Sequence, residues 1–239
     1  MIGDGRVRVG GLPATTSARR VDAGASVTVV TDGPQYVSRG GVKLAGALAA
    51  FSLDVRGRVA LDAGASTGGF TDCLLQHGVT RVHAVDVGRG QLAWSLRQDP
   101  RVVVYERTNV RTLDPALLGE PVDLVVADLS FISLCTVAPA LLACASASAE
   151  FVLLVKPQFE AGPARVGRGG IVRDPEVHVA VMHEVVTGLA AAGLFVTGVV
   201  ASSIRGAEGN REFLVRADRT GPVLAAGVLD AVARDEVAA

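Results

Sequence analysis

Short apolar runs alternate with amphipathic stretches along the chain from residue 58 onward. Seven runs are typical of strands, and they are Arg58–Asp62, Arg81–Asp86, Val102–Tyr105, Val122–Asp128, Phe151–Val155, Gly193–Ala201 and Glu212–Ala217. Helical spacing of apolar positions occurs over Gly40–Ala50, Gly68–His77, Gln91–Arg97, Thr136–Ala145 and Glu176–Ala192. This alternation predicts an α/β domain with a mostly parallel sheet that helices cover on both faces. The link between the last two strands is too short for a helical crossover, so these two are expected to pair antiparallel.

The first 31 residues follow a different pattern, that of short β elements. Arg6–Val9 alternates polar and apolar residues, Gly10–Pro13 is typical of a turn, and Ser26–Thr31 is mostly β-branched and apolar. Asp32-Gly33-Pro34 then interrupts the pattern. We therefore expect a β-rich segment over residues 1–31, a linker over 32–37 and the α/β domain over 38–239.

Composition excludes several classes of protein. The chain has 239 residues, 49% of them hydrophobic and 20% charged, which is enough apolar sequence for a core and unlike a disordered chain. Its longest apolar stretch, Val185–Ala201, is broken by glycines and is shorter than a membrane span of about 20 residues. There is no secretory signal pattern and no metal-ligand spacing. We expect a cytoplasmic protein with no membrane contact and no metal.

Charge is unevenly distributed along the chain. Residues 1–60 carry eight basic and four acidic side chains, whereas the rest carries fifteen basic and twenty acidic ones. The beginning of the chain is therefore the expected contact for a polyanion. Of the 23 basic residues 21 are arginines, and Lys43 and Lys156 are the two lysines. They are either two ordinary surface residues or positions that need an ammonium, which can lose its proton where a guanidinium cannot.

The first predicted strand of the α/β domain ends in a glycine-rich loop, Leu61–Phe70. In a doubly wound sheet, ligands bind at the carboxyl ends of the strands, where the strand order reverses. The loop does not match the GxGxxG pattern of dinucleotide sites, and it opens with Asp62, which would repel a pyrophosphate but suits a positive amino group. Asp86 ends the next strand, where a carboxylate can accept both hydroxyls of a ribose. An acid suited to an amino group and an acid suited to a ribose together fit S-adenosylmethionine. Taken alone, Asp62 could be a helix cap, and the glycines could simply form a turn.

Charged residues also stand at the ends of other predicted strands. Asp128 ends the fourth strand, and Lys156 directly follows the fifth and precedes a proline. Lys43 lies on the helix before the domain, next to Ser38–Gly41, and Glu212 opens the seventh strand. These two lysines and two acids are plausible members of one site.

At these residues the chain resembles a known family. Leu61–Phe70 resembles the cofactor loop of FtsJ-like (RrmJ-type) ribose methyltransferases, and the Lys-Asp-Lys-Glu set resembles their catalytic tetrad. Four longer segments resemble the TlyA family of hemolysin-named rRNA cytidine 2′-O-methyltransferases, and they are Ser38–Leu44, Gly90–Arg97, Val126–Leu134 and Val155–Glu160. The resemblance covers essentially the whole chain. It implies a Rossmann-like class I methyltransferase fold with a seven-stranded sheet.

The chain departs from the family at its start. Family members carry an N-terminal S4-type RNA-binding domain that opens with two helices, whereas Met1–Val30 matches only the closing β part. We therefore expect a partial S4-type segment here. Because half of such a module leaves a hydrophobic face uncovered, a start codon further upstream is favoured over natural truncation.

The resemblance also implies a function and a set of site residues. We expect S-adenosylmethionine-dependent methylation of a ribose 2′-hydroxyl, that of a cytidine in ribosomal RNA, by a monomer. The implied catalytic residues are Lys43, Asp128, Lys156 and Glu212; Glu212 is preferred to Glu208 because Asn210–Phe213 fits the family pattern better. The implied cofactor-binding residues are Asp62, Gly64, Ser66, Gly68, Gly69, Phe70, Asp86, Asn109 and Asp128.

RNA contacts are expected from exposed arginines. The candidates are Arg6, Arg8, Arg19, Arg20 and Arg39, with Arg165 and Arg168 in the glycine-rich loop Glu160–Asp174, which is expected to be mobile and to close over RNA. The alternative is a solvated basic face. Lys156 is expected to activate the hydroxyl, either as a base or by stabilising the alkoxide, while Asp128 holds its ammonium.

Other function classes fit the sequence less well. A pore-forming hemolysin would need a membrane-inserting segment, and a nicotinamide-dependent oxidoreductase would leave the two lysines and two acids unused. Methyltransferases that act on exocyclic amines typically carry Asn/Asp-Pro-Pro-Tyr where this chain has Asp128–Phe131. A non-catalytic RNA-binding protein would have no need of the complete set of two lysines and two acids.

Overall fold

The chain divides into two compact units, Met1–Gln35 and Tyr36–Ala239. The structure is a computed structural model, and it describes residues 2, 7–18, 20–22, 24–29, 34–206, 208–222 and 224–234. In the first part, β1 (Val7–Val9) pairs antiparallel with both β2 (Leu12–Pro13) and β3 (Val27–Val29). The predicted β-rich segment is therefore a small three-stranded antiparallel sheet.

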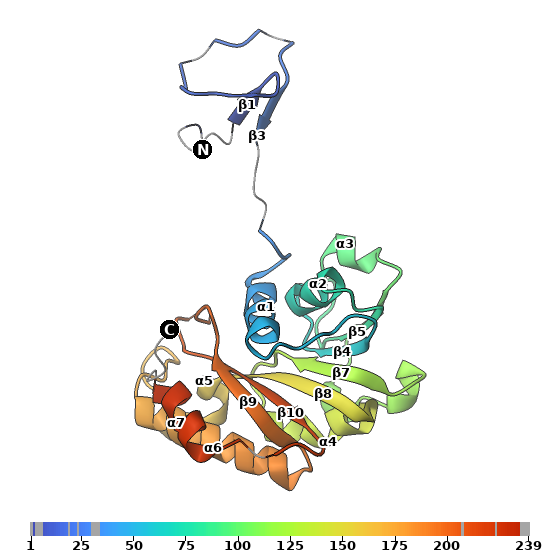
Figure 1. Ribbon diagram of the computed structural model, residues 1–239, viewed down its shortest axis with the longest axis vertical. Helices are drawn as coiled ribbons and strands as arrows, with labels where there is room; N and C mark the ends of the chain where they lie inside the picture. The colour runs from blue at the N-terminus through green and yellow to red at the C-terminus, as the bar shows by residue number, and fades with distance from the viewer. Residues whose placement is uncertain are drawn as a thin grey trace. The chain divides into compact units, whose positions relative to one another are not determined.

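A seven-stranded sheet forms the centre of the second part (Figure 1). Its strands are β4 (Val59–Ala63), β5 (Arg81–Val85), β6 (Val102–Tyr105), β7 (Val122–Ala127), β8 (Ala145–Val155), β9 (Phe195–Ala201) and β10 (Phe213–Asp218). They lie in the order β6-β5-β4-β7-β8-β10-β9. Only β10, of the described strands of this sheet, runs antiparallel to its neighbours β8 and β9. The predicted mostly parallel sheet and its antiparallel last pair are both confirmed.

Helices cover both faces of this sheet (Figure 1). One face packs against α1 (Arg39–Ala50), α2 (Gly69–Gln76) and α3 (Trp94–Arg97), and the other against α4 (Leu134–Cys144), α6 (Pro175–Ala191) and α7 (Ala226–Arg234). Between β8 and α6 lie the short α5 (Pro157–Glu160) and a 3-10 turn, Pro163–Arg165; two more 3-10 turns, Val110–Thr112 and Pro115–Leu118, follow β6. None of the described helices is long and apolar enough to cross a membrane.

Alternating strand residues supply the two cores. In β7, Val125 packs in the core beneath α4 and α6, whereas Leu124 and Val126 pack in the core beneath α1 and α2. Successive side chains of a strand point to opposite faces, so a strand covered on both faces needs apolar residues at nearly every position. This is why the strands of this sheet appear in the sequence as continuous apolar runs.

Strand β8 starts six residues earlier than the sequence predicts. Its first part, Ala145–Glu150, consists of alanine, serine and one glutamate, residues with little preference for strands. Its two ends pair with β7, Ala145 with Val122 and Glu150 with Leu124, and Glu150 also contacts Arg58 at 2.7 Å and pairs with Arg216 of the neighbouring β10. Tertiary contacts that the local pattern cannot show therefore extend the strand.

The strand order reverses next to β4. The chain runs outward from β4 through β5 to β6, and then returns so that β7 lies on the other side of β4. The carboxyl ends of β4 and β7 therefore flank the crevice in which open α/β sheets bind their ligands. Asp62 lies in β4 near that edge, and Asp128 directly follows β7.

Candidate functional site

The loop after β4 is pressed against the end of β7. Gly64 has φ +89°, and its amide donates to the carbonyl of Val85 at 2.8 Å. A Cβ added at Gly64 would lie 2.4 Å from the carbonyl oxygen of Asp128. Both the backbone conformation and the lack of space require glycine here. The loop thus brings the ends of three strands, β4, β5 and β7, close together.

Asp62 is completely buried beneath this loop. Its Oδ2 accepts a hydrogen bond from the hydroxyl of Thr71 at 2.6 Å, whereas its Oδ1 has no partner among the described residues. Burial and, to a smaller extent, the nearby charges of Asp128 and Asp86 raise the pKa of Asp62 to about 7, against the lowering effect of the Thr71 hydrogen bond. Three carboxyl groups therefore converge here, an environment that favours a cation.

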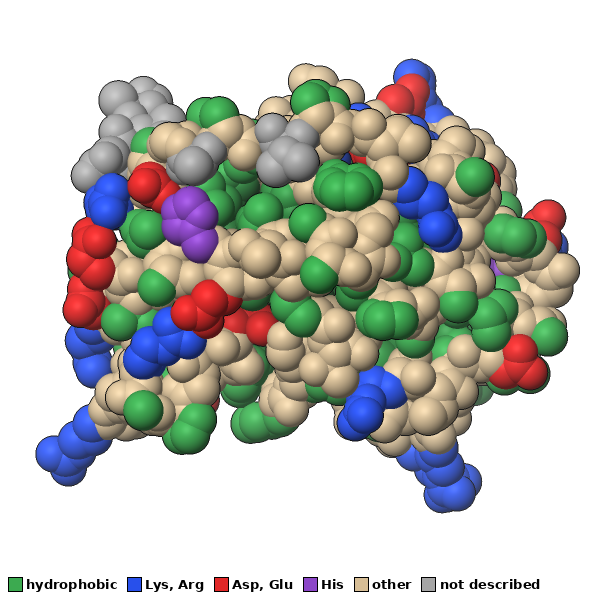
Figure 2. Space-filling model, turned by 90° about the horizontal axis from the view of Figure 1, so that it is seen from below, with side chains coloured by type: hydrophobic (Ala, Val, Ile, Leu, Met, Phe, Trp, Pro, Cys, Tyr) green, Lys and Arg blue, Asp and Glu red, His purple; other side chains and the backbone are tan. Residues whose placement is uncertain are grey.

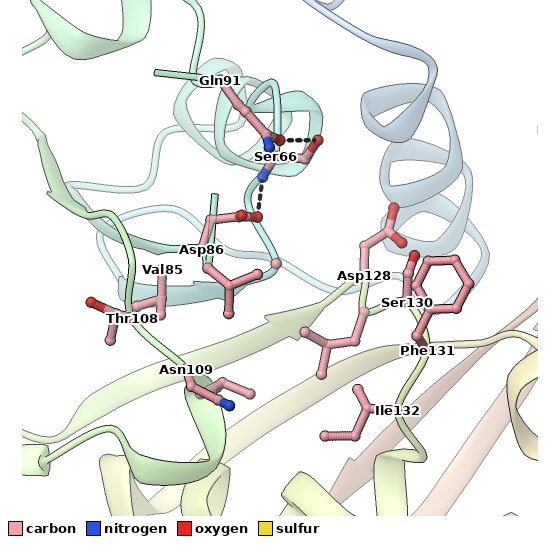
Figure 3. A pocket seen from close by; sticks show the side chains of 14 residues that line it. Ser66, Val85, Asp86, Gln91, Thr108, Asn109, Asp128, Ser130, Phe131 and Ile132 are labelled. Carbon is pink, nitrogen blue, oxygen red and sulfur yellow. Dashed lines mark hydrogen bonds between the residues drawn. The ribbon is translucent and has the colours of Figure 1, made fainter. Parts of the chain in front are cut away.

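Asp86 joins two loops at the end of β5. Its Oδ2 accepts from the amide of Ser66 at 2.8 Å (Figure 3), and its Oδ1 accepts from the amide of Gly88 at 2.6 Å. The hydroxyl of Ser66 in turn lies 3.4 Å from Oε1 of Gln91. A carboxylate offers about four acceptor positions, so Asp86 keeps capacity for the hydroxyls of a ligand.

A cavity of about 530 Å³, called here the cofactor cavity, opens in front of these residues (Figure 3). Of the predicted cofactor residues, it is lined by Gly64, Ser66, Asp86, Asn109 and Asp128. Gly69 and Phe70 line a second cavity of about 190 Å³, the middle cavity, together with Asp128 and Lys156. Asp62 and Gly68 line neither cavity.

Gly68 and Gly69 serve chain packing more than the predicted approach to a ligand. Gly68 has φ +99°, and a Cβ there would lie 2.2 Å from the side chain of Leu96. A Cβ at Gly69 would lie 2.2 Å from the hydroxyl oxygen of Ser38. The two glycines let α2 begin directly against α3 on one side and the start of α1 on the other. The sequence shows that a glycine is present, but it does not show which neighbouring side chain packs where a Cβ would lie.

The four predicted catalytic residues form two ion pairs. Nζ of Lys156 lies 2.5 Å from Oδ1 of Asp128 at the end of β7. Nζ of Lys43 on α1 lies 2.5 Å from Oε2 of Glu212, which precedes β10. Lys43 and Glu212 are 7% and 3% exposed, so this second pair is buried. Glu208, the alternative to Glu212, is exposed.

A third cavity of about 450 Å³, called here the acceptor groove, adjoins the two pairs. It is lined by Lys43, Lys156 and Glu212, and it shares Lys156 with the middle cavity. The middle cavity in turn shares Asp128 with the cofactor cavity. The sequence therefore places its two lysines along one path from the cofactor cavity to the acceptor groove. Among the described residues, no group of three or more His, Cys, Asp or Glu side chains is arranged to hold a metal ion.

The predicted RNA-binding arginines differ in their surroundings. Arg6 and Arg19 lie outside the described residues, whereas Arg8, Arg20, Arg39 and Arg168 are exposed. Arg39 also lines the acceptor groove. Arg165 is engaged within the protein, since its guanidinium makes two 2.7 Å hydrogen bonds to Glu184 and a third, also 2.7 Å, to the carbonyl of Ala161. Its prediction as a phosphate contact is therefore not supported by the geometry.

The loop Glu160–Asp174 is more firmly held than the sequence suggests. The buried side chain of Asn210 accepts from the amide of Val172 at 3.0 Å and donates to the carbonyl of Gly170 at 2.9 Å. The backbone also forms a bridge between Gly167 and Ile171. Only the tip around Arg168 projects without such anchors among the described residues, so closure of the whole loop over RNA is not what this geometry favours.

The face on the side of α6 gives no alternative basic surface (Figure 2). Its basic side chains are scattered singly over the face and its edges, several of them beside acidic residues, as far as the described residues show. A polyanion would find more cations at the carboxyl edge of the sheet, where Arg39, Arg107 and Arg111 are exposed. Sequence reasoning did not select Arg107 and Arg111, although they flank Asn109.

Phe131 is another residue that sequence reasoning missed as a site residue. It is 89% exposed, has φ +62°, and lines both the cofactor cavity and the acceptor groove. Its ring packs on that of Phe159 at 4.8 Å between centroids. A non-glycine residue with positive φ at a rim of two cavities is a strained position of the kind that clusters at functional sites. No pattern in the sequence distinguishes such a phenylalanine from a core residue.

The sequence pattern of the FtsJ-like methyltransferase family matches residues 36–219. The chain belongs to this family. This FtsJ-like chain is also 53% identical over 237 residues to the 16S/23S rRNA (cytidine-2′-O)-methyltransferase TlyA of Mycobacterium tuberculosis, an alignment that covers 98% of the chain and 88% of the relative. It is 38% identical to Hemolysin A of Brachyspira hyodysenteriae over 88% of each protein.

A solved structure agrees with these similarities. The FtsJ-like chain superimposes on a hemolysin-named protein from Streptococcus thermophilus with a TM-score of 0.82 and 38% identity, covering 98% of this chain and 86% of that one. The predicted family is therefore confirmed, and with it a methyltransferase activity in place of an oxidoreductase or a non-catalytic protein.

Proposed function

We propose that this chain transfers a methyl group from S-adenosylmethionine to the 2′-hydroxyl of a cytidine in ribosomal RNA. The observation that carries the proposal is the pair of ion pairs, Lys156–Asp128 and Lys43–Glu212, lying between the cofactor cavity and the acceptor groove. The similarity over nearly the whole chain to a relative named for this reaction supports it. Such an enzyme would work as a monomer on ribosomes or their subunits in the cytoplasm.

The residues of the cofactor cavity fit S-adenosylmethionine. When bound, this cofactor supplies an activated methyl group on a positively charged sulfur. Asp86 would accept the ribose hydroxyls, and Asn109 and Asp128 would contact the cofactor from the opposite walls of the cavity. Asp62 would act from beneath the loop, since its unpartnered Oδ1 and its proximity to two more carboxyl groups favour a positive ligand.

Lys156 would stabilise the oxygen that accepts the methyl group. A hydroxyl is a weak nucleophile until its proton is withdrawn or its developing negative charge is stabilised. Nζ forms an ion pair with Asp128 at 2.5 Å, which holds its positive charge at a fixed place beside the acceptor. This contact favours an electrostatic role for Lys156 over that of a base. Holding the acceptor in line would supply much of the remaining rate enhancement.

Phe131 would hold the target base. Enzymes that modify a nucleotide within folded RNA commonly act on unpaired or flipped-out bases, which stack on aromatic side chains. An almost fully exposed ring at the junction of the cofactor cavity and the acceptor groove meets that need. Phe159 supports the ring from the other side. Arg39, Arg107 and Arg111 would contact the surrounding phosphates.

Methyl transfer to unmodified ribosomal subunits tests the proposal. The subunits are incubated with radiolabelled S-adenosylmethionine, and the labelled nucleotide is mapped after nuclease digestion. We expect label on a cytidine ribose, and its absence with the wild-type protein would overturn the proposal. Lys156→Arg keeps the charge but changes its geometry and should lose nearly all activity. The matched control is Arg56→Lys. It exchanges the same two residue types in the opposite direction, at an exposed ion pair with Asp54. Near-normal turnover of Lys156→Arg would refute the role of Lys156.

A further inference from the structure

Ser130 occupies the junction of the three cavities. Of the described residues, it alone lines the cofactor cavity, the middle cavity and the acceptor groove. It lies in the loop after β7, two residues beyond Asp128, and the side chains of both residues project from this loop beside the cofactor cavity (Figure 3). Ser130 is exposed, so its hydroxyl is not explained by packing in the core.

The hydroxyl of Ser130 contacts the ammonium of Lys156. Nζ donates to Oγ of Ser130 at 3.1 Å and lies 2.5 Å from Oδ1 of Asp128. The ring of Phe159 lies 5.8 Å from Nζ. A lysine ammonium has three N–H groups. Two of them are therefore directed to fixed acceptors, and the third has no hydrogen-bond acceptor among the described residues.

Two acceptors restrict the ammonium more than one can. With Asp128 as its sole acceptor, the long Lys156 side chain could swing about that single contact. A second contact fixes Nζ in position, and tetrahedral geometry then sets the direction of the remaining N–H. Ser130 does this without adding charge, because its hydroxyl is neutral. A second carboxylate would hold Nζ equally well but would cancel the positive charge that an alkoxide needs.

We propose that Ser130 is a positioning residue for Lys156, fixing its ammonium so that the third N–H is available to the oxygen that accepts the methyl group. This inference rests on the proposed function, since it assigns Ser130 a part in that reaction. Ser130 acts through Lys156 and needs no contact of its own with the cofactor or the RNA.

Steady-state kinetics separate this role from a contribution to binding or folding. Loss of a hydrogen bond to a charged group should lower kcat of Ser130→Ala about 10- to 100-fold. Cofactor affinity by calorimetry and KM for RNA should stay within about twofold. Ser130→Thr retains the hydroxyl, has room at this exposed position, and should recover most of kcat. Ser148→Ala, at the opposite end of β8 from Lys156, is the control for removing an exposed serine hydroxyl.

A second measurement reports on the contact without activity. Because the chain has two lysines, labelling with [13C]lysine gives two Cε signals by NMR, one for Lys156 and one for the buried Lys43. Ser130→Ala should move the Lys156 signal and leave that of Lys43 in place. An unmoved Lys156 signal, wild-type kcat in Ser130→Ala, or equal losses in the alanine and threonine variants would overturn the inference. An inactive wild-type protein would instead overturn the proposed function.

Discussion

Replacing Asp62 with asparagine should remove a pH dependence of stability that arises from this one buried carboxyl. Burial raises its pKa from the ordinary 3.8 to about 7 in the folded protein. Between these values the folded protein holds a proton that the unfolded chain has lost, so the free energy of unfolding falls as pH rises from about 4 to about 7. At about 1.4 kcal/mol per pH unit, the loss from this group reaches about 4 kcal/mol.

Urea unfolding of the ligand-free protein at pH 5 and at pH 8 measures this effect. In Asp62→Asn the side-chain oxygen can still accept from Thr71, but no proton can be taken up or lost at this position. Other titrating groups contribute equally to both proteins, so the difference between their pH profiles isolates Asp62. Only the part of the titration above pH 5 falls between the two pH values, so we expect the wild-type protein to lose about 3 kcal/mol more than the variant. Parallel profiles would refute the reasoning that this carboxyl is buried with one oxygen unpartnered.

Three further predictions concern the ion pairs, the loop and the exposed ring. Lys43→Met should lower the free energy of unfolding by about 3–5 kcal/mol because it leaves the buried carboxylate of Glu212 without a partner. Adding Glu212→Leu should restore much of that stability. Additive losses in urea unfolding would contradict a buried pair. Gly64→Ala forces a Cβ against the carbonyl of Asp128 and should weaken cofactor binding in calorimetry at least tenfold. Unchanged cofactor affinity would refute the claim that this loop has no space for a Cβ. Phe131→Ala should weaken RNA binding about 5- to 100-fold, and Phe131→Tyr should bind RNA normally. Equal RNA affinity in the alanine variant would exclude stacking.

The sheet could be predicted from the sequence because burial on both faces leaves a signal at every strand position. Leu124–Ala127 is one such apolar run, and its residues divide between the two cores. The start of β8 left no such signal, since Ala145–Glu150 is made of small and polar residues. Its last residue, Glu150, pairs with Arg58 and Arg216, which are distant in the sequence. Contacts of this kind are invisible to a local pattern.

The site residues could be predicted where their chemistry requires a particular residue type. They were harder to predict where their role depends on their position in space. Two lysines in an arginine-rich chain, and acids at strand ends, mark positions that need particular functional groups. Their pairing, Lys156 with Asp128 and Lys43 with Glu212, follows from strand order and could not be read from spacing. Ser130 was overlooked because serine is common in exposed loops, and only its contact with Nζ sets it apart.

The two ion pairs differ in exposure, and this difference argues for different roles. The side chains of Lys43 and Glu212 are 8% and 3% exposed, and the contact joins positions 169 residues apart in the chain. It therefore fixes the start of α1 beside β10 and shapes the acceptor groove. The side chains of Lys156 and Asp128 are 11% and 23% exposed, at a rim where a substrate oxygen can reach the ammonium. Arginine should thus fail at both positions for different reasons. At position 43 a planar guanidinium cannot reproduce the 2.5 Å contact that the compact ammonium makes with the buried Glu212. At position 156 its planar fork cannot direct single N–H groups to Asp128, Ser130 and the acceptor.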